Sequence, residues 1–240
     1  MTERLTIVIP TYNEAANLAG LVQGVLELVP TAQVLIVDDN SPDGTGAIAD
    51  DLAANTGQVQ VLHRAQKDGI GPAYIAGFRL ALDQGADLIA EMDADGSHAP
   101  TDLVRLLAAT KSADLVIGSR YIAGGETVGW PQSRKLLSRA GGMYARFVLR
   151  APVNDLTSGF KIYRRAALES LDLGALKSDG YSFQIETTWR VWRKGFTVRE
   201  VPITFHDRVA GKSKLSRRIV YEAMFIVWQL RLDRSSGPSA

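Results

Sequence analysis

Residues 88–98 read LIAEMDADGSH, an apolar run followed at once by acidic and small polar residues. The run from Leu88 to Met92 is short and rich in aliphatic side chains, which is typical of a strand buried in a parallel sheet. Asp93 and Asp95 follow where that strand ends. Because ligands of open α/β sheets bind at the carboxyl ends of the strands, this stretch predicts both a parallel sheet and a site at its edge.

The same order of apolar run and polar cluster recurs through the first 120 residues. The alternation of strands with helices predicts an α/β fold, a mostly parallel twisted sheet flanked by helices. The polar strings PTYNE, DDNSPDGT and GSRY follow the first, second and fifth strands, so we expect them on the same rim as residues 93–98. The other predicted strands are Leu5–Ile9, Val34–Val37, Val59–Leu62 and Leu115–Ile117; the helices lie near 14–28, 44–55, 71–84 and 101–110, with Asp43 and Thr101 as N-caps.

The second half of the chain has a less regular pattern. One domain is predicted over residues 1–232, and the polar tail 233–240 is predicted to be disordered. The elements expected after residue 121 are an amphipathic helix over 134–150, a short strand over 160–163, a helix over 181–194, an extended segment over 197–205, a basic loop over 208–216 and a final apolar helix over 219–230.

The charges are distributed unevenly along the chain. Residues 1–110 contain 5 Lys or Arg and 15 Asp or Glu, whereas residues 111–240 contain 22 and 11. This asymmetry predicts an anionic partner for the second half, with ordinary solvated helix faces as the alternative. The absence of cysteine excludes disulfides, a thiolate zinc site and a cysteine nucleophile, and it fits a reducing cytosol.

Neither a secretory signal peptide nor a transmembrane span is expected from the sequence. Two basic amphipathic segments could instead lie in the plane of lipid headgroups, and packing against the sheet is the alternative for each. The first carries Arg134, Lys135, Arg139, Arg146 and Arg150 beside Leu136, Leu137, Met143, Phe147 and Val148; the second carries Phe225, Ile226, Trp228 and Leu230 behind Arg217 and Arg218.

Asp93 and Asp95 form a D-x-D motif that suits a divalent cation. Two carboxylates can converge on Mg²⁺ or Mn²⁺, which prefer hard oxygen ligands and can bridge a diphosphate. Ser97 could add a weaker oxygen ligand. The alternative is a solvated loop that caps the next helix.

Asp38 and Asp39 form a second acidic pair, at the end of the second predicted strand. A carboxylate there can accept hydrogen bonds from a ribose or a base, and capping of the following helix is the alternative. Lys67, in the turn KDGIG, could reach a phosphate. The three histidines lack metal-ligand spacing, and only His98 lies beside the D-x-D loop.

The strings PTYNE, VDDNSPDGT, DADGSH, GSRY, TSGFK and RVAGKSK, in this order, resemble the family 2 glycosyltransferases of GT-A fold. Within that family they are most similar to the dolichol-phosphate (polyprenol-phosphate) mannose synthases. The resemblance covers roughly residues 4–232. PTYNE and D-x-D indicate only the broad superfamily, whereas DDNSPDGT and the basic R-x-x-G-x-S-K loop point to the polyprenol-phosphate subgroup.

The resemblance also implies roles for individual residues. Asp93, Asp95 and Arg120 would be catalytic, and Asp93 and Asp95 would hold the metal. Ser97 would be a third metal ligand, at a position where some relatives carry glutamine. The nucleotide-sugar site would comprise Pro10, Tyr12, Glu14, Val37, Asp39, Lys67, Asp93, Ala94, Asp95, Arg120, Arg208 and Lys214; the acceptor phosphate site would comprise Arg120, Arg134 and Ser138.

The reaction implied is inverting, metal-dependent transfer of mannose from GDP-mannose to a polyprenyl phosphate. It would take place on the cytoplasmic face of a membrane, with the enzyme bound peripherally or through a membrane-anchoring protein partner. A phosphate acceptor, with a second pKa of about 6, is already largely dianionic at neutral pH and needs no strong general base.

Parts of the sequence are compatible with four alternatives to this reaction. One is transfer of glucose or another sugar from a UDP-sugar to the same type of lipid. A second is a sugar-hydroxyl acceptor, which would call for a general base. A third is a nucleotide-sugar sensor without turnover. Nucleic acid is not expected as a partner, because the acidic first half would repel it and no recognised nucleic-acid-binding motif is present.

Overall fold

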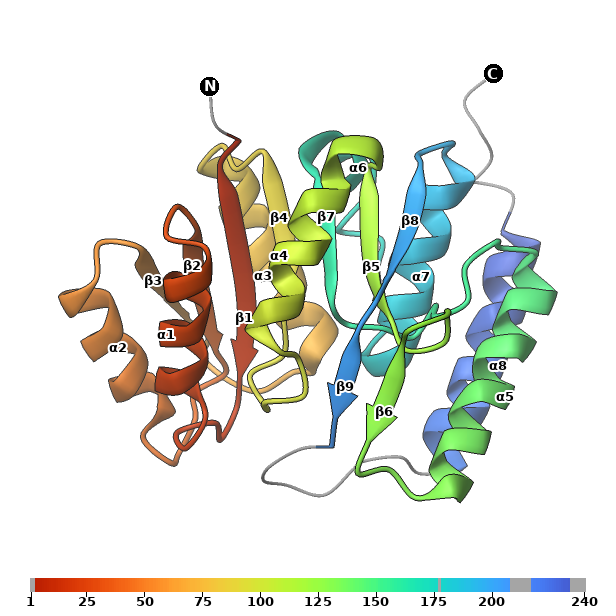
Figure 1. Ribbon diagram of the computed structural model, residues 1–240, viewed down its shortest axis with the longest axis horizontal. Coiled ribbons are helices and arrows are strands. Elements are labelled where there is room, and N and C mark those ends of the chain that lie inside the picture. The colour runs from red at the N-terminus through yellow and green to blue at the C-terminus, as the bar shows by residue number, and fades with distance from the viewer. Residues whose placement is uncertain (1–2, 177, 208–216, 234–240) are drawn as a thin grey trace.

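The computed structural model describes residues 3–176, 178–207 and 217–233, without the side chains of residues 217–224. Within these residues a seven-stranded sheet forms the centre of the molecule, with the strand order β3-β2-β1-β4-β7-β5-β8 (Figure 1). A two-stranded sheet, β6-β9, lies beside it. The strands are β1 (Leu5–Thr11), β2 (Gln33–Asp38), β3 (Val59–His63), β4 (Leu88–Glu91), β5 (Leu115–Ser119), β6 (Glu126–Val128), β7 (Lys161–Arg164), β8 (Val198–Pro202) and β9 (Thr204–His206).

The mostly parallel sheet predicted from the sequence is confirmed. The exception is β7, which is antiparallel to both of its neighbours: Leu88 of β4 pairs with Arg164, and Leu115 of β5 pairs with Tyr163. This strand separates β4 from β5, so the residues that follow β4 and those that precede β7 meet at the same edge of the sheet.

Helices cover both faces of the large sheet (Figure 1). Apolar residues of α1, α2 and α4 pack on one face, and those of α3, α5, α6, α7 and α8 pack on the other. The helices are α1 (Leu18–Leu28), α2 (Thr45–Asn55), α3 (Ile70–Asp83), α4 (Pro100–Ala109), α5 (Gln132–Leu149), α6 (Arg165–Glu169), α7 (Gly180–Arg193) and α8 (Arg217–Leu232), with a 3₁₀ turn, η1 (Thr110–Ser112), after α4.

Helix α3 lies very close to β1, and Gly77 is the reason. A Cβ on Gly77 would come within 2.3 Å of Val8 Cγ1. Because glycine has no side chain, the helix approaches the strand directly, and Tyr74 and Phe78 on the same helix are fully buried. Because α3 follows β3, which is parallel to β1 and β2, its N-terminal turn lies near the carboxyl ends of these strands.

Three details of the helix starts differ from the sequence prediction. Thr101 is not the N-cap of α4, which begins at Pro100 after Ala99; proline suits the first helical position because it has no N–H to satisfy. Helix α1 begins at Leu18 rather than near residue 14. Asp43 lies one residue before the N-cap of α2, where its Oδ1 accepts a 3.1 Å hydrogen bond from the Thr45 N–H.

Helices α5 and α8 lie side by side at one edge of the molecule (Figure 1). Their outer side is apolar and exposed: Phe147 of α5 is 83% exposed and Trp228 of α8 is 52% exposed, and Leu136, Met143, Phe225 and Leu232 are also exposed. Within the described part of the chain, none of the helices has both the length and the apolar character needed to cross a bilayer.

The basic loop over 208–216 and residues 234–240 of the predicted tail lie outside the described residues. Asp233, the first residue of that tail, pairs with Arg190 of α7 at 3.3 Å.

Candidate functional site

A cavity of about 430 Å³ opens at the carboxyl ends of β1, β2, β4 and β5, where the sequence predicts the site. Ten of the predicted site residues line it. They are Pro10, Tyr12, Glu14, Asp39, Lys67, Asp93, Ala94, Asp95, Arg120 and Arg134.

Five predicted residues are not seen in the lining. The side chain of Val37 is fully buried in the core, because it points from β2 toward the helix layer rather than toward the rim. Ser97 and Ser138 lie nearby but outside the lining, and the Ser138 hydroxyl accepts a 2.6 Å hydrogen bond from the Tyr121 hydroxyl. Arg208 and Lys214 lie outside the described residues.

The D-x-D loop that follows β4 is held by hydrogen bonds from three directions. The Tyr74 hydroxyl donates to Asp93 Oδ1 at 2.9 Å, and the Asp93 backbone N–H donates to His98 Nδ1 at 3.1 Å. The Ser97 N–H donates to Asp95 Oδ1 at 3.1 Å. Burial, and then the negative charge of Asp93, raise the pKa of Tyr74 well above its ordinary value, so the phenol keeps its proton and acts as a donor.

The chemistry of the D-x-D loop fits a divalent cation. Asp93 and Asp95 supply carboxylate oxygens to one cavity, and Ser97 Oγ is buried with no hydrogen-bond partner among the described residues. In that same part of the chain, no three His, Cys, Asp or Glu side chains form a group that could hold a metal. A cation here would therefore need further oxygen ligands from a bound diphosphate and water, as Mg²⁺ commonly takes.

Arg120 lies across the cavity in a rigid environment. Asp155, fully buried, accepts from it at 2.7 Å (Nε to Oδ2) and 2.6 Å (Nη2 to Oδ1), and Thr157 Oγ1 accepts at 2.8 Å. Burial alone would lower the pKa of Arg120, but the Asp155 carboxylate outweighs it and raises that pKa. The guanidinium also lies 5.1–5.6 Å from the ring centroids of three aromatic residues, Tyr121, Trp130 and Phe205.

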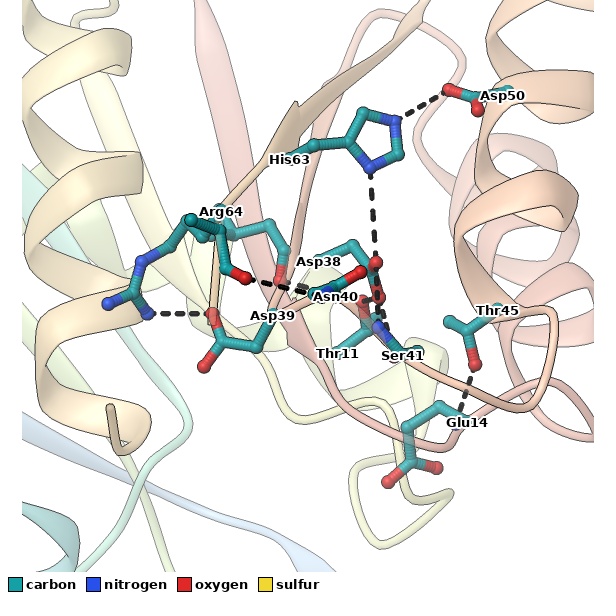
Figure 2. A network of polar contacts seen from close by, with 12 residues as sticks. Thr11, Glu14, Asp38, Asp39, Asn40, Ser41, Thr45, Asp50, His63 and Arg64 are labelled. Atoms are coloured by element: carbon teal, nitrogen blue, oxygen red, sulfur yellow. Dashed lines mark hydrogen bonds and ion pairs between the residues drawn. The ribbon is translucent and has the colours of Figure 1, made fainter. Parts of the chain in front are cut away.

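A polar network fixes the other end of the cavity, where β1 and β2 end (Figure 2). Arg64 Nη1 donates to Asp39 Oδ1 at 2.7 Å, and the Glu14 backbone N–H donates to Thr45 Oγ1 at 2.9 Å. Burial raises the pKa of Asp39 more than the charge of Arg64 lowers it. Lys67 makes a cation–π contact with Tyr12, with Nζ 3.5 Å from the ring centroid.

Arg134, at the start of α5, is the second arginine of the cavity. Its Nη1 lies 2.8 Å from Asp207 Oδ1, and its guanidinium carbon lies 4.0 Å from the Trp130 ring centroid. Asp207 follows β9, so this contact joins the first turn of α5 to the end of the two-stranded sheet. Arg120 and Arg134 thus place two guanidinium groups in the same cavity, and such groups match phosphate oxygens well.

A buried charged network lies behind the D-x-D loop. Lys161 of β7 donates to Gln184 Oε1 and lies 4.0 Å from Glu91 Oε2, and both charged side chains are fully buried. Burial lowers the pKa of Lys161 to about 8, with Glu91 partly opposing it. Burial also raises the pKa of Glu91. Gln184 connects this network to the cavity, because it is a lining residue.

Several lining residues were not singled out from the sequence. Asp179 Oδ1 accepts a 2.8 Å hydrogen bond from the Gly71 N–H at the first turn of α3. A polar residue immediately before Gly180 and the α7 helix is the signal that could have marked Asp179. The group also includes Thr157, Gly159, Tyr181, Ser182, Gln184 and Phe205. Thr157 and Gly159 belong to the string TSGFK.

Comparison with known proteins identifies the family. Residues 6–172 match the family described as glycosyl transferase family 2. The chain is 50% identical to the polyprenol monophosphomannose synthase of Mycolicibacterium smegmatis, covering 98% of this chain and 91% of that protein. It is 51% identical to the undecaprenyl-phosphate mannosyltransferase of Micrococcus luteus, covering 92% of this chain and 91% of that protein.

Solved structures support the fold independently. The glucosyl-3-phosphoglycerate synthase of Mycobacterium tuberculosis, solved with Mg²⁺ and uridine diphosphate, has a TM-score of 0.70 to this chain at 17% identity, covering 99% of this chain and 81% of that one. The same enzyme solved with Mn²⁺, UDP-glucose and phosphoglyceric acid has a TM-score of 0.68. The GT-A fold expected from the sequence is confirmed, and so is the enzyme class. The chain belongs to glycosyl transferase family 2.

Proposed function

We propose that this chain transfers a mannosyl group from GDP-mannose to a polyprenyl phosphate, with Mg²⁺ or Mn²⁺, at a membrane surface. The observation that carries the proposal is one cavity that holds the carboxylates of Asp93 and Asp95 together with the guanidinium groups of Arg120 and Arg134. A nucleoside diphosphate bound through a cation, and a second phosphate bound by arginine, both need these groups. The names of the two mannosyltransferase relatives support the choice of sugar and acceptor.

The donor would bind between β1 and the D-x-D loop. Tyr12, Glu14 and Asp39 would contact the nucleoside, and Lys67 would lie near the diphosphate. The cation, held by Asp93 and Asp95 with Ser97 as a candidate third ligand, would neutralise the charge that develops on the departing diphosphate. Pro10, Ala94 and Arg120 complete the set of lining residues assigned to the donor.

The acceptor phosphate would bind on the arginine side of the cavity. Arg120 and Arg134 would contact its oxygens directly. Ser138 is four residues after Arg134 on the same helix. Its hydroxyl would bind the acceptor phosphate once its hydrogen bond with Tyr121 is broken. Arg208 and Lys214, which follow β9 in the sequence, are further candidates for the donor phosphates.

The reaction would be a single inverting displacement. An oxygen of the acceptor phosphate forms a bond to the anomeric carbon while the bond from that carbon to the donor diphosphate breaks, and GDP leaves with the electron pair. The acceptor oxygen is already ionised, so no proton has to be removed. Arg120, fixed by Asp155, stabilises phosphate charge without having to reorient.

The outer side of α5 and α8 would face the bilayer. Helix α5 carries exposed Leu136, Met143 and Phe147, and it contains basic residues but no acidic one. Such a surface suits insertion among anionic headgroups. We place the enzyme on the cytoplasmic face, either directly bound or held by a membrane-anchoring protein.

The test is transfer of radiolabel into the organic phase in detergent. GDP-mannose with polyprenyl phosphate and Mg²⁺ or Mn²⁺ should give labelled lipid, and omission of the metal should abolish it. UDP-glucose replaces GDP-mannose in a parallel reaction. Label from UDP-glucose alone would overturn the mannose assignment, and label that appears only with a sugar-hydroxyl acceptor would overturn the lipid acceptor.

A further inference from the structure

Tyr74 lies in an apolar helix, away from the polar loops, yet its hydroxyl reaches the D-x-D motif. It is on α3 and fully buried, and it donates the 2.9 Å hydrogen bond to Asp93 Oδ1. Its ring stacks on Phe78 and Phe183, with centroid distances of 5.7 and 6.1 Å. Because the ring is packed on both neighbours, the position of the hydroxyl is fixed by the core of the protein.

Asp93 is also held through its backbone. Its backbone N–H donates to His98 Nδ1, and the His98 ring stacks on Phe160 at 4.7 Å. Gly159, a lining residue, has no side chain to fill the space near the carboxylate: a Cβ there would lie 3.6 Å from Asp93 Oδ2. One carboxylate oxygen is thus held by a phenol, and the other lies beside a glycine of the cavity wall.

We propose that Tyr74 is a positioning residue that sets the orientation of the Asp93 carboxylate for cation binding. The inference rests on the metal-dependent reaction proposed above. Hydrogen-bond partners of metal-binding carboxylates fix their orientation, and loss of such a partner costs about 10- to 100-fold in metal affinity or activity. Tyr74 does not touch substrate; it acts through Asp93.

Tyr163 provides a matched control. It is also a fully buried tyrosine, and its hydroxyl donates a 2.7 Å hydrogen bond to a carboxylate oxygen, Oε1 of Glu91. Glu91 is the last residue of β4 and is not among the cavity-lining residues. Tyr74→Phe and Tyr163→Phe therefore each remove a buried hydroxyl that donates to a carboxylate, but only the first carboxylate belongs to the D-x-D motif. The Tyr163 hydroxyl also contacts Lys161 Nζ at 3.4 Å and Thr187 Oγ1 at 3.2 Å.

The experiment measures Mn²⁺ affinity in the presence of GDP from the electron paramagnetic resonance signal of free Mn²⁺, with thermal melting of each variant alongside. We expect Tyr74→Phe to weaken Mn²⁺ binding about 10- to 100-fold, and Tyr163→Phe to bind Mn²⁺ like the wild type. Raising the Mn²⁺ concentration should restore mannosyl transfer by Tyr74→Phe.

Three outcomes would overturn the inference alone: an unchanged affinity in Tyr74→Phe, an equal loss in both variants, or a Tyr74→Phe chain that does not fold although Tyr163→Phe does. The last would show that the hydroxyl serves the fold. A wild-type chain that binds GDP but no Mn²⁺ would instead overturn the metal dependence in the proposed function, and the inference with it.

Discussion

Asp155 holds Arg120 through two parallel hydrogen bonds, from Nε to Oδ2 at 2.7 Å and from Nη2 to Oδ1 at 2.6 Å. A third bond, from the Arg120 backbone N–H to Asp155 Oδ2 at 3.0 Å, ties the same carboxylate to the end of β5. Both side chains are almost completely buried, so the pair combines a fixed geometry with a charge that cannot be solvated. Asp155 therefore fixes the direction in which the Arg120 side chain points.

Asp155→Asn should destabilise the protein by about 3–5 kcal/mol, because it leaves the Arg120 charge buried without its partner. Urea unfolding at neutral pH measures this. Burial alone would raise the pKa of Asp155, but the charge and hydrogen bonds of Arg120 hold it below its ordinary value. The wild type should therefore have its full excess in unfolding free energy over Asp155→Asn above the ordinary carboxyl pKa. This excess should disappear as the pH falls through the lower pKa of Asp155 in the native protein.

Glu169→Gln is the control for that experiment, since Glu169 pairs with Arg165 at 2.6 Å on the surface of α6. A partly exposed pair of this kind contributes about 0–1 kcal/mol. Equal effects of the two substitutions would contradict the role assigned to Asp155.

His98→Ala should weaken donor binding, whereas His98→Asn should preserve most of it. Asparagine places an oxygen near the position of Nδ1 and can still accept from the Asp93 N–H, and alanine cannot. Leaving that buried N–H without an acceptor costs about 1–3 kcal/mol, or roughly 5- to 150-fold in affinity if the D-x-D loop rearranges. Titration with GDP and Mn²⁺ measures the difference, and an equal loss of binding in the two variants would show that the stacking on Phe160, not the hydrogen bond, is what matters.

Asp179→Asn should retain most of the turnover rate, within about tenfold of the wild type. An ionised phosphate acceptor does not require a general base, which typically contributes 10²–10⁴-fold where one is used. The asparagine oxygen can still accept from the Gly71 N–H, so the N-terminus of α3 keeps its contact. Single-turnover kinetics would decide: a loss of about 10³-fold with normal GDP binding would identify Asp179 as a base and argue for a hydroxyl acceptor.

Stability should depend on Lys161 at alkaline pH. Its native pKa of about 8 lies below the ordinary lysine value of 10.5, so between these values the unfolded chain binds more protons than the native one. The unfolding free energy of the wild type should therefore rise relative to Lys161→Met, by about 3 kcal/mol in total, as the pH increases from 8 to 10.5. Lys111→Met on the exposed surface of η1 is the control, and a wild-type curve that runs parallel to the Lys161→Met curve would contradict the lowered pKa of Lys161.

Phe147→Ser should weaken binding to vesicles that contain anionic lipid by about tenfold, because a phenyl group that is 83% exposed in the free protein would no longer enter the interface. Co-sedimentation with vesicles measures this. Val104 of α4, also exposed, is the matched control, and Val104→Ser should bind like the wild type. Equal binding by the wild type, Phe147→Ser and Val104→Ser would contradict the assignment of the α5–α8 surface as the membrane contact.

Much of the fold could be predicted because the local signals agree with it. The aliphatic runs that became β1, β2, β3, β4 and β5 are long enough to identify strands, and each polar string follows a strand end. A polar cluster at a carboxyl end lies on the rim in any parallel sheet, so Tyr12, Asp39 and Asp93 could be assigned to the cavity without knowing the strand order.

The site residues that the sequence does not reveal depend on contacts between distant parts of the chain. Asp155 meets Arg120 only because β7 inserts antiparallel between β4 and β5, and no local pattern encodes that pairing. Tyr74 lies among apolar residues of a helix and looks like an ordinary core residue. The family resemblance implies that Val37 lines the nucleotide pocket, but strand alternation turns its side chain into the core.

The uneven distribution of charge along the chain becomes, in the folded protein, a separation in space. The acidic first half of the chain contributes β1, β2, β3, α1 and α2 at one edge of the sheet, while α5, with four basic residues and no acidic one, lies at the other (Figure 1). The molecule therefore carries an electric dipole that runs across the sheet. An anionic surface exerts a torque on such a dipole and turns the protein during its approach, so that the α5 edge arrives first; the effect reaches about 8–10 Å at physiological salt and weakens as salt is added.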